Sequence, residues 1–307
     1  MANVTASMVK ELRDMTGAGM MDCKNALQET DGDTEAAVDW LRKKGLSKAA
    51  KKSSRVAAEG LIGIAVKSDA GALVEINSET DFVARNDQFK GFVKKAAELA
   101  LEAGGDMDKL LKAPAEGGKP VGEAITELVA KIGENMSVRR AAAISVSPGI
   151  VAAYVHNSEA PELGKIGVLV ALKSEGDKDK LAALGKQIAM HIAAAAPLAL
   201  TPEHLSADVV ERERAIHADA ARQSGKPENV IEKMIEGRMR KFFEESVLLS
   251  QTFVIDGETQ ISKVLEKASK ELGTPVAIEG FVRFQVGEGI EKEDVDFADE
   301  VKAMSGR

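Results

Sequence analysis

Few residues of the 307-residue sequence have the types and spacing that catalysis requires. No His-Glu-x-x-His or other short metal-ligand spacing connects the four histidines, which are His156, His191, His204 and His217. The sequence also contains no Walker phosphate loop and no Gly-x-Ser-x-Gly nucleophile elbow. Gly17 and Gly19 lack the third glycine of a dinucleotide fingerprint and follow no strand pattern. We therefore expect a protein that acts by binding, without a catalytic residue, a cofactor or a metal ion.

Three titratable side chains fit structural roles better than chemical ones. Cys23 lies beside Met and Ala in a helical pattern, which is typical of a core thiol. His191 lies among Ala and Ile in a helical segment, which predicts a buried packing residue. His217 has charged neighbours in another helical segment, so we expect it to be solvated.

Two short segments have a pattern that is typical of protein binding. In the first, Asn77-Ser-Glu-Thr-Asp-Phe-Val-Ala-Arg85, polar residues follow a strand pattern. Thr80 or Asp81 can cap the next helix, which would place Phe82 and Val83 in the core. The alternative is that Asp81 and Phe82 are displayed together, because an exposed aromatic is a typical interface anchor. Propensity alone favours the cap, and both interpretations stay open at this point.

The second segment is Arg13-Asp-Met-Thr-Gly-Ala-Gly-Met-Met-Asp22. Adjacent helical residues are about 100° apart, so Met20 and Met21 cannot both face one narrow core. We expect one of them at the surface, where Met suits adaptable contacts. The alternative is that one packs on the third helix and the other on a neighbouring unit.

The elements that position these segments begin with three short helices in the first 45 residues. Met8, Leu12 and Met15 recur at helical spacing in the first helix. Asp33 is the expected cap of the third helix, which we predict to stop at Gly45. Residues 42–55 contain seven Lys or Arg and no acid, which favours a solvated tether over a surface for nucleic acid or membrane.

The middle of the chain predicts two related α+β units with antiparallel sheets. Strand pairs with a short connection are expected at 60–67 with 72–77 and at 149–156 with 167–172. An Ala-rich helix follows each pair, at about 87–103 and 178–195, and a further strand suits 138–146 and 280–286. This order of hairpin, helix and returning strand is an α+β pattern.

A helical hairpin interrupts the second unit at 201–245, with its turn at Ser224-Gly-Lys-Pro227. The expected apolar seam consists of Val209, Ile216 and Ala220 before the turn and Ile231, Met234, Ile235 and Phe242 after it. A protruding hairpin with such a seam would suit contact with a second copy. Residues 288–300 are acidic, and the spacing of Phe297, Val301 and Met304 predicts a short amphipathic helix.

Composition limits the class of protein further. Apolar residues make up 44% and charged residues 29%, a normal globular balance, and the net charge of −8 is unlike that of a basic nucleic-acid binder. A single cysteine excludes an internal disulfide framework. The apolar stretch 188–200 is shorter than the roughly 18 residues that span a bilayer. With no secretory pattern at the N-terminus, we expect a cytoplasmic protein without a membrane or direct nucleic-acid partner.

The sequence resembles the bacterial elongation factor Ts family, whose members are guanine-nucleotide exchange factors of elongation factor Tu. The resemblance rests on Leu12-Arg-Asp-Met-Thr-Gly-Ala-Gly-Met-Met-Asp-Cys-Lys24, Glu79-Thr-Asp-Phe-Val-Ala84, Lys131-Ile-Gly-Glu-Asn135, His191, Ser224-Gly-Lys-Pro227, Glu236-Gly-Arg-Met239 and Val286-Gly-Glu-Gly289. The sequence is longer than typical members near 102–123 and 157–164, which we expect to be loops.

The resemblance implies five parts: a three-helix domain similar to ubiquitin-associated domains with its linker (1–55), a first core subdomain (56–146), a second core subdomain (147–200 and 246–287), the inserted hairpin (201–245) and a C-terminal helical module (288–307). It implies that the hairpin forms a homodimer in some members.

The resemblance also implies which residues bind elongation factor Tu. Thr80, Asp81, Phe82 and Val83 would enter that GTPase near its magnesium and switch region. Arg13, Met20 and Met21 would touch its nucleotide domain, and His156 would face another of its domains.

Three other functions compete with exchange activity. An adaptor would use the three-helix domain and hairpin without exchange. A small-molecule enzyme would use the cleft between the core units but lacks a nucleophile–base pair. An RNA-associated factor would use residues 42–55 against the overall charge of −8.

Overall fold

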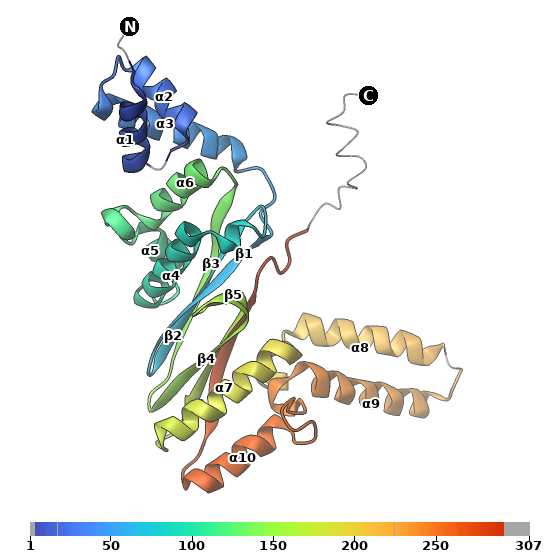
Figure 1. Cartoon of the computed structure of the whole chain (residues 1–307). Coiled ribbons are helices and arrows are strands. Elements are labelled where there is room, and N and C mark those ends of the chain that lie inside the picture. Colours follow the sequence, from blue (N-terminus) through green and yellow to red (C-terminus); the bar gives the residue numbers. More distant parts are fainter. Residues whose placement is uncertain (1–3, 17, 224, 292–307) are drawn as a thin grey trace.

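The computed structural model describes residues 4–16, 18–223 and 225–291 (Figure 1). Within these residues, helices surround a six-stranded sheet in which every pairing is antiparallel. The α+β class is therefore confirmed. The expected helix with Phe297, Val301 and Met304 lies outside the described residues.

Three helices form the N-terminal bundle at one end of the molecule: α1 (Ala6–Thr16), α2 (Met20–Glu29) and α3 (Thr34–Lys52) (Figure 1). Leu12, Cys23 and Leu27 are fully buried in its small core. The Asp33 carboxylate accepts a hydrogen bond from the backbone N of Ala36 at 3.0 Å, so the expected cap is confirmed.

The predicted end of the third helix at Gly45 is wrong, because α3 continues to Lys52. Gly45 faces helix α6 (Val121–Ile132), and a Cβ at this position would lie 2.9 Å from Cβ of Ala130. The glycine therefore allows two helices to approach closely instead of ending one of them. The basic stretch 42–55 is consequently a helix end with its tail, and Lys52 Nζ donates to the carbonyl of Gly133 after α6.

The six strands form two sets of three with the same internal order. The first set is β1 (Glu59–Lys67), β2 (Ala70–Ser78) and β3 (Met136–Ser145), and the second is β4 (Gly149–Ala160), β5 (Leu163–Lys173) and β6 (Ala277–Gln285). In each set, the second strand pairs with both the first and the third. We expected a separate sheet in each unit, but the two sets form one sheet. They are joined because Ile62 and Gly63 of β1 pair with Gly164 and Leu163 of β5.

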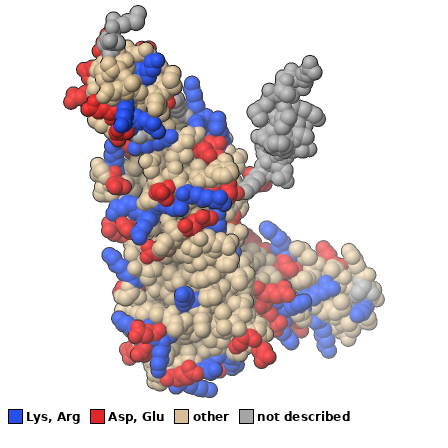
Figure 2. All heavy atoms as spheres, viewed as in Figure 1, with Lys and Arg blue, Asp and Glu red and all other residues tan. Residues whose placement is uncertain are grey.

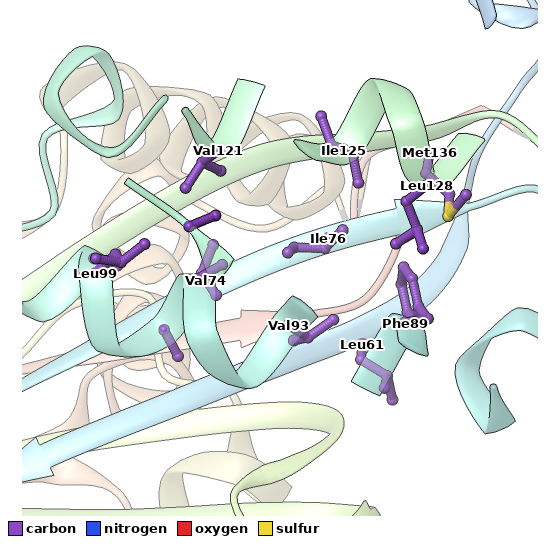
Figure 3. Close-up of a cluster of buried hydrophobic side chains, with 14 of the residues drawn as sticks. Leu61, Val74, Ile76, Phe89, Val93, Leu99, Val121, Ile125, Leu128 and Met136 are labelled. Atoms are coloured by element: carbon purple, nitrogen blue, oxygen red, sulfur yellow. The ribbon is translucent and has the colours of Figure 1, made fainter. Parts of the chain in front are cut away.

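The strands alternate between a face covered by helices and a face covered by the other set. Leu61, Val74 and Ile76 point toward α4 (Asp87–Glu102) and α6 (Figure 3). Helices α7 (Lys178–Ala195) and α10 (Ile261–Leu272) cover the second set in the same way. Ile62 and Leu169 lie in the cluster between the sets. The period of two residues thus produces three apolar layers from two sets of strands.

Both regions expected to be loops contain regular structure. Helix α5 (Met107–Lys112) lies within 102–123, capped by Asp106 and anchored by the fully buried Leu110. Residues 157–164 continue β4 and β5 as paired strands around a tight turn, in which Glu162 has φ of 67°.

The predicted hairpin is confirmed as α8 (Ala207–Arg222) and α9 (Glu228–Ser246), which lie side by side away from the sheet (Figure 1). The predicted seam of α8 is wrong at two of its three positions: Ile216 is 55% exposed and Ala220 is exposed, whereas Val209 is half-buried and Ala221 is fully buried. His217 is not solvated as expected, because its Nε2 lies 3.1 Å from Oε1 of Glu213 and its side chain is half-buried. Ile231 of α9 is buried as expected.

Candidate functional site

The strongest candidate surface is the turn between β2 and α4. The cap of α4 is Asn86, whose Oδ1 accepts from the backbone N of Gln88 at 2.9 Å and of Phe89 at 3.2 Å. Neither Thr80 nor Asp81 is therefore the cap. A short 3₁₀ turn, Val83–Arg85, begins at the last of the candidate residues and leads directly to the cap.

The side chains of this turn point in different directions. Phe82 is 73% exposed, so the interpretation that placed it in the core is wrong. Asp81 is also exposed, with Oδ2 3.9 Å from a guanidinium nitrogen of Arg85. Val83 is buried in the core beneath α4 and α6, at 3% exposure. Asp81 and Phe82 are thus exposed side by side, and the next residue, Val83, fixes their turn to the core.

Thr80 is half-buried and points toward the loop after α6. Its backbone N donates to Oε2 of Glu134 at 3.0 Å, and its hydroxyl donates to Oε1 of the same carboxylate at 2.8 Å. The contact joins residues that are 54 positions apart, and no local sequence pattern predicts it. At one end of the contact, the local signal in the sequence was the polar pair Glu134-Asn135 directly after the glycine that ends α6.

A second candidate surface lies on the N-terminal bundle. Met20 is 59% exposed and Met21 is 66% exposed, so both face outward where one was expected to do so. Met15, expected on the apolar side of its helix, is 57% exposed as well, and Arg13 is exposed. Met15 lines a cleft of about 230 Å³ between the bundle and α6, together with Val38, Leu41 and Ala130 among others.

His156 lies on a third element, the outward-facing part of β4. Its side chain is exposed, and Nδ1 lies 3.2 Å from the hydroxyl of Tyr154, two residues earlier on the same face. The candidate residues therefore occupy three separate elements: the bundle, the turn between β2 and α4, and β4.

Two buried titratable groups hold the framework together. His191 is fully buried as expected; its Nε2 lies 2.9 Å from Oε1 of Gln251, and its Nδ1 accepts from the backbone N of Val254 at 3.3 Å. Burial lowers the pKa of His191, although the hydrogen bond with Gln251 acts in the opposite direction. The ring is thus kept neutral as a structural link between α7 and the segment after α9.

Glu75 is a fully buried carboxylate for which no role was predicted, although it interrupts the apolar strand pattern Leu73-Val-Glu-Ile76. It accepts hydrogen bonds from Arg139, Arg140 and the backbone N of Gly287 at 2.5–3.0 Å. Burial raises the pKa of Glu75, but the hydrogen bonds from Gly287, Asn77 and the two arginines outweigh it and hold the pKa below its usual value. This cluster ties the end of β6 to β2 and β3.

Among the described residues, neither Cys23 nor a cluster of metal-ligating side chains provides a reactive site. Cys23 is fully buried, and burial raises the pKa of its thiol, so it is a core residue in the neutral form. No group of three or more His, Cys, Asp or Glu within residues 4–16, 18–223 and 225–291 is placed to hold a metal ion. Among the same residues, no helix is both long and apolar enough to cross a membrane.

Charges of both signs are interspersed over the visible face of the molecule, including the bundle and the hairpin (Figure 2). Part of the basic stretch is paired: Arg42 lies 3.4 Å from Glu123, Lys44 lies 3.6 Å from Asp22, and Arg55 lies 3.3 Å from Glu79. These pairs make the stretch less typical of a surface for a polyanion.

The fold and the candidate surfaces define an α+β protein with exposed candidate side chains on a turn, a helical bundle and a strand. The sequence model described as elongation factor TS matches residues 79–288. An elongation factor Ts of Rhodospirillum centenum is 62% identical over the whole of both chains, one of Maricaulis maris is 58% identical over the whole of both, and one of Rhodospirillum rubrum is 59% identical over 99% of both. The chain belongs to the elongation factor Ts family, and its class is therefore that of the translation elongation factors.

Proposed function

We propose that this protein is a guanine-nucleotide exchange factor that binds elongation factor Tu carrying GDP and promotes GDP release during translation elongation. The observation that carries the proposal is Phe82, an aromatic side chain that is 73% exposed on a turn within one of the motifs that carry the resemblance to the family. An exposed aromatic of this kind is a typical anchor at a protein interface. The chain acts by binding, without a catalytic residue or cofactor of its own.

The proposed mechanism follows from thermodynamic linkage. If the factor binds nucleotide-free GTPase more tightly than GDP-bound GTPase, it must weaken GDP binding by the same factor. Magnesium joins the phosphates to the switch elements of a GTPase, so a disturbance of its surroundings removes a large electrostatic contribution to nucleotide affinity. No acid or base is required for this effect.

Each residue of the turn has a distinct part in this mechanism. Phe82 wedges into an apolar pocket of the partner and displaces the switch region. Asp81, exposed beside it, brings a negative charge toward the magnesium and the phosphates. Val83 and Thr80 hold the backbone of the turn in place. Val83 packs in the core, and Thr80 is hydrogen-bonded to Glu134.

The other surfaces supply affinity away from the nucleotide. Arg13, Met20 and Met21 are exposed on the bundle and suit contact with the partner's nucleotide domain, since Met adapts to irregular surfaces. His156, exposed on β4, suits a contact with another domain of the partner.

The same proposal covers organisation and location. The bundle with its tail (1–55) is a ubiquitin-associated-like domain, 56–146 and 147–200 with 246–287 are the core subdomains, and 288–307 is a C-terminal helical module. The hairpin (201–245) provides a route to a homodimer, which sedimentation at several concentrations would test. We place the protein in the cytoplasm, without a membrane or direct nucleic-acid partner.

One experiment tests the proposed function against its alternatives. Purified elongation factor Tu loaded with fluorescent GDP is mixed with excess unlabelled GDP, with and without this protein, and a pull-down measures complex formation in parallel. We expect a stable complex and accelerated release. Binding without acceleration would support an adaptor, and absence of a complex would contradict every form of the proposal.

A further inference from the structure

We propose that Glu134 is a positioning residue for exchange activity, because its carboxylate fixes the turn that displays Phe82. The inference rests on the proposed function and concerns the same surface. It assigns a role to a side chain that itself need not touch the partner. Glu134 lies in the loop between α6 and β3.

The contact of Glu134 with Thr80 is bidentate. Oε2 accepts the backbone N–H of Thr80 at 3.0 Å, and Oε1 accepts the hydroxyl at 2.8 Å. Hydrogen bonds to an ionised carboxylate are stronger than those between neutral groups. Thr80 is only two residues before Phe82, so this contact fixes the backbone from which the aromatic side chain departs.

A second carboxylate makes the contact reciprocal. Oε1 of Glu79 accepts the backbone N–H of Asn135 at 2.5 Å, so each segment supplies a carboxylate to the other's backbone. We call Glu79, Thr80, Glu134 and Asn135 the carboxylate clamp. Two such contacts in opposite directions fix both the distance and the register between the turn and the loop.

The tail of α3 contributes to the clamp from a third direction. Arg55 donates to Oε2 of Glu79 at 3.3 Å, and the carbonyl of Arg55 accepts from Nδ2 of Asn135 at 2.7 Å. Glu79 is correspondingly well shielded, with 19% of its side chain exposed. The turn is therefore fastened to segments that lie far from it in the sequence.

Gly133 explains how Glu134 reaches Thr80. It ends α6 in the left-handed region, with φ of 90° and ψ of 13°, where a glycine is favoured. This conformation turns the chain out of the helix directly before the clamp. The end of the helix and the position of the carboxylate are therefore consequences of one residue.

The function of the clamp is to hold Phe82 in an exposed position before the partner arrives. A side chain on a fixed backbone loses less conformational entropy on binding than one on a mobile turn. Replacing Glu134 by Ala removes both contacts to Thr80 and leaves Phe82 on a looser segment. We expect GDP release at subsaturating factor to be slowed about tenfold, which is less than the two lost hydrogen bonds are worth together, because they affect the partner only through the position of Phe82.

Matched variants separate positioning from charge and from general stability. Glu134→Gln keeps the length, its Oε1 accepts from the Thr80 N–H, and its amide donates to the hydroxyl, so it should retain more exchange activity than Glu134→Ala, although less than the unaltered protein because neutral hydrogen bonds are weaker. Glu134→Asp keeps the charge but is one methylene shorter, so it should be impaired like Glu134→Ala. Glu98→Ala, which removes an exposed carboxylate on α4 that pairs with Lys95, is the surface control and should behave as the unaltered protein.

Two further readouts test whether Glu134 acts through the Phe82 turn. Hydrogen exchange of the Thr80 amide in the free protein should be faster in Glu134→Ala and Glu134→Asp and slow again in Glu134→Gln. In a Phe82→Ala background, Glu134→Ala should slow GDP release no further, since the residue that it positions is already absent.

The outcomes distinguish this inference from the proposed function. If the unaltered protein does not accelerate GDP release, the proposed function fails, and the role of Glu134 in exchange fails with it. If the unaltered protein is active but Glu134→Ala matches it, or if Glu134→Gln is as impaired as Glu134→Asp, only the positioning role is overturned. An equal loss from Glu134→Ala with and without Phe82 would also overturn it. Thermal unfolding of each variant tests whether the fold is retained.

Discussion

Replacing Phe82 by Ala is the most direct perturbation of the proposed interface. Because Phe82 is 73% exposed, its removal creates no core cavity, and the free energy of unfolding should change by less than about 0.5 kcal/mol. The neighbouring Val83, at 3% exposure, remains as the anchor of the turn. Any loss of exchange activity in this variant would therefore reflect the interface and not the fold.

The expected magnitude follows from the exposed area of the ring. An aromatic side chain buries on the order of 150 to 250 Å² when it is fully enclosed. With 73% of Phe82 available, and at about 25 cal/mol per Å², enclosure by the partner is worth roughly 3 to 4.5 kcal/mol. A loss of about 3 kcal/mol corresponds to a rate lower by on the order of 100-fold at subsaturating factor, where the rate reports the free factor and partner.

The assay is stopped-flow release of fluorescent GDP from elongation factor Tu over a range of factor concentrations. Val66→Ala is the matched control, because Val66 is another exposed apolar residue (41%) of the same unit, near the end of β1 away from the turn. Val66→Ala should behave as the unaltered protein. Wild-type release rates with correctly folded Phe82→Ala would refute the wedge, whatever the other surfaces contribute.

Three further predictions concern the second surface and the two buried groups. Met20→Ala combined with Met21→Ala should weaken binding to elongation factor Tu by about tenfold with little change in the saturated release rate or melting temperature, as measured by calorimetric titration and stopped-flow; a lower saturated rate at unchanged affinity would contradict this. Glu75→Gln should lower the free energy of unfolding at pH 7 by roughly 3 kcal/mol in urea denaturation, because it leaves two arginines without their buried partner. Since the pKa of Glu75 is lowered on folding, its stabilisation is present above the unfolded value near 4.5 and is lost as the pH falls through the folded pKa, so the difference between the two proteins should shrink in acid. Since burial lowers the pKa of His191, the unfolded state binds a proton below about pH 6.5 before the folded state does, so the free energy of unfolding should fall between pH 7.5 and 5.5, and less so in His191→Gln; parallel pH profiles would contradict the assignment.

Local patterns predicted the elements well wherever burial repeats with a regular period. Short apolar runs bounded by turn residues located the six strands of the described residues, and the Ala-rich segment 178–195 coincides with α7. Helices α6 and α10 were missed, although Val121, Ile125 and Leu128 recur at spacings of four and three residues. The pattern was present, but the Gly- and Pro-rich stretch before it favoured a loop.

Tertiary contacts account for what the sequence could not predict. Gly45 reads as a helix end by propensity, but its role is to let α3 approach α6, which depends on the position of Ala130. The direction of the Phe82 side chain could not be predicted either, because it depends on which residue caps α4. That residue is Asn86 and not Thr80 or Asp81. For Gly45, helix propensity was outweighed by a contact with a distant residue. For Phe82, the expected cap was replaced by one a few residues further along the chain.

The arrangement around Phe82 also explains how an exposed aromatic can be kept at low cost in the free protein. A large apolar side chain at the surface gains little from the fold, so its direction must be imposed by its neighbours. Here Val83 is held in the core and Thr80 is held by Glu134, which fixes the backbone on both sides of Asp81 and Phe82. Asp81 and Phe82 therefore have little freedom to turn inward. Less conformational entropy is lost when they bind the partner. Affinity in such a surface depends as much on the buried residues on either side as on the ring that touches the partner.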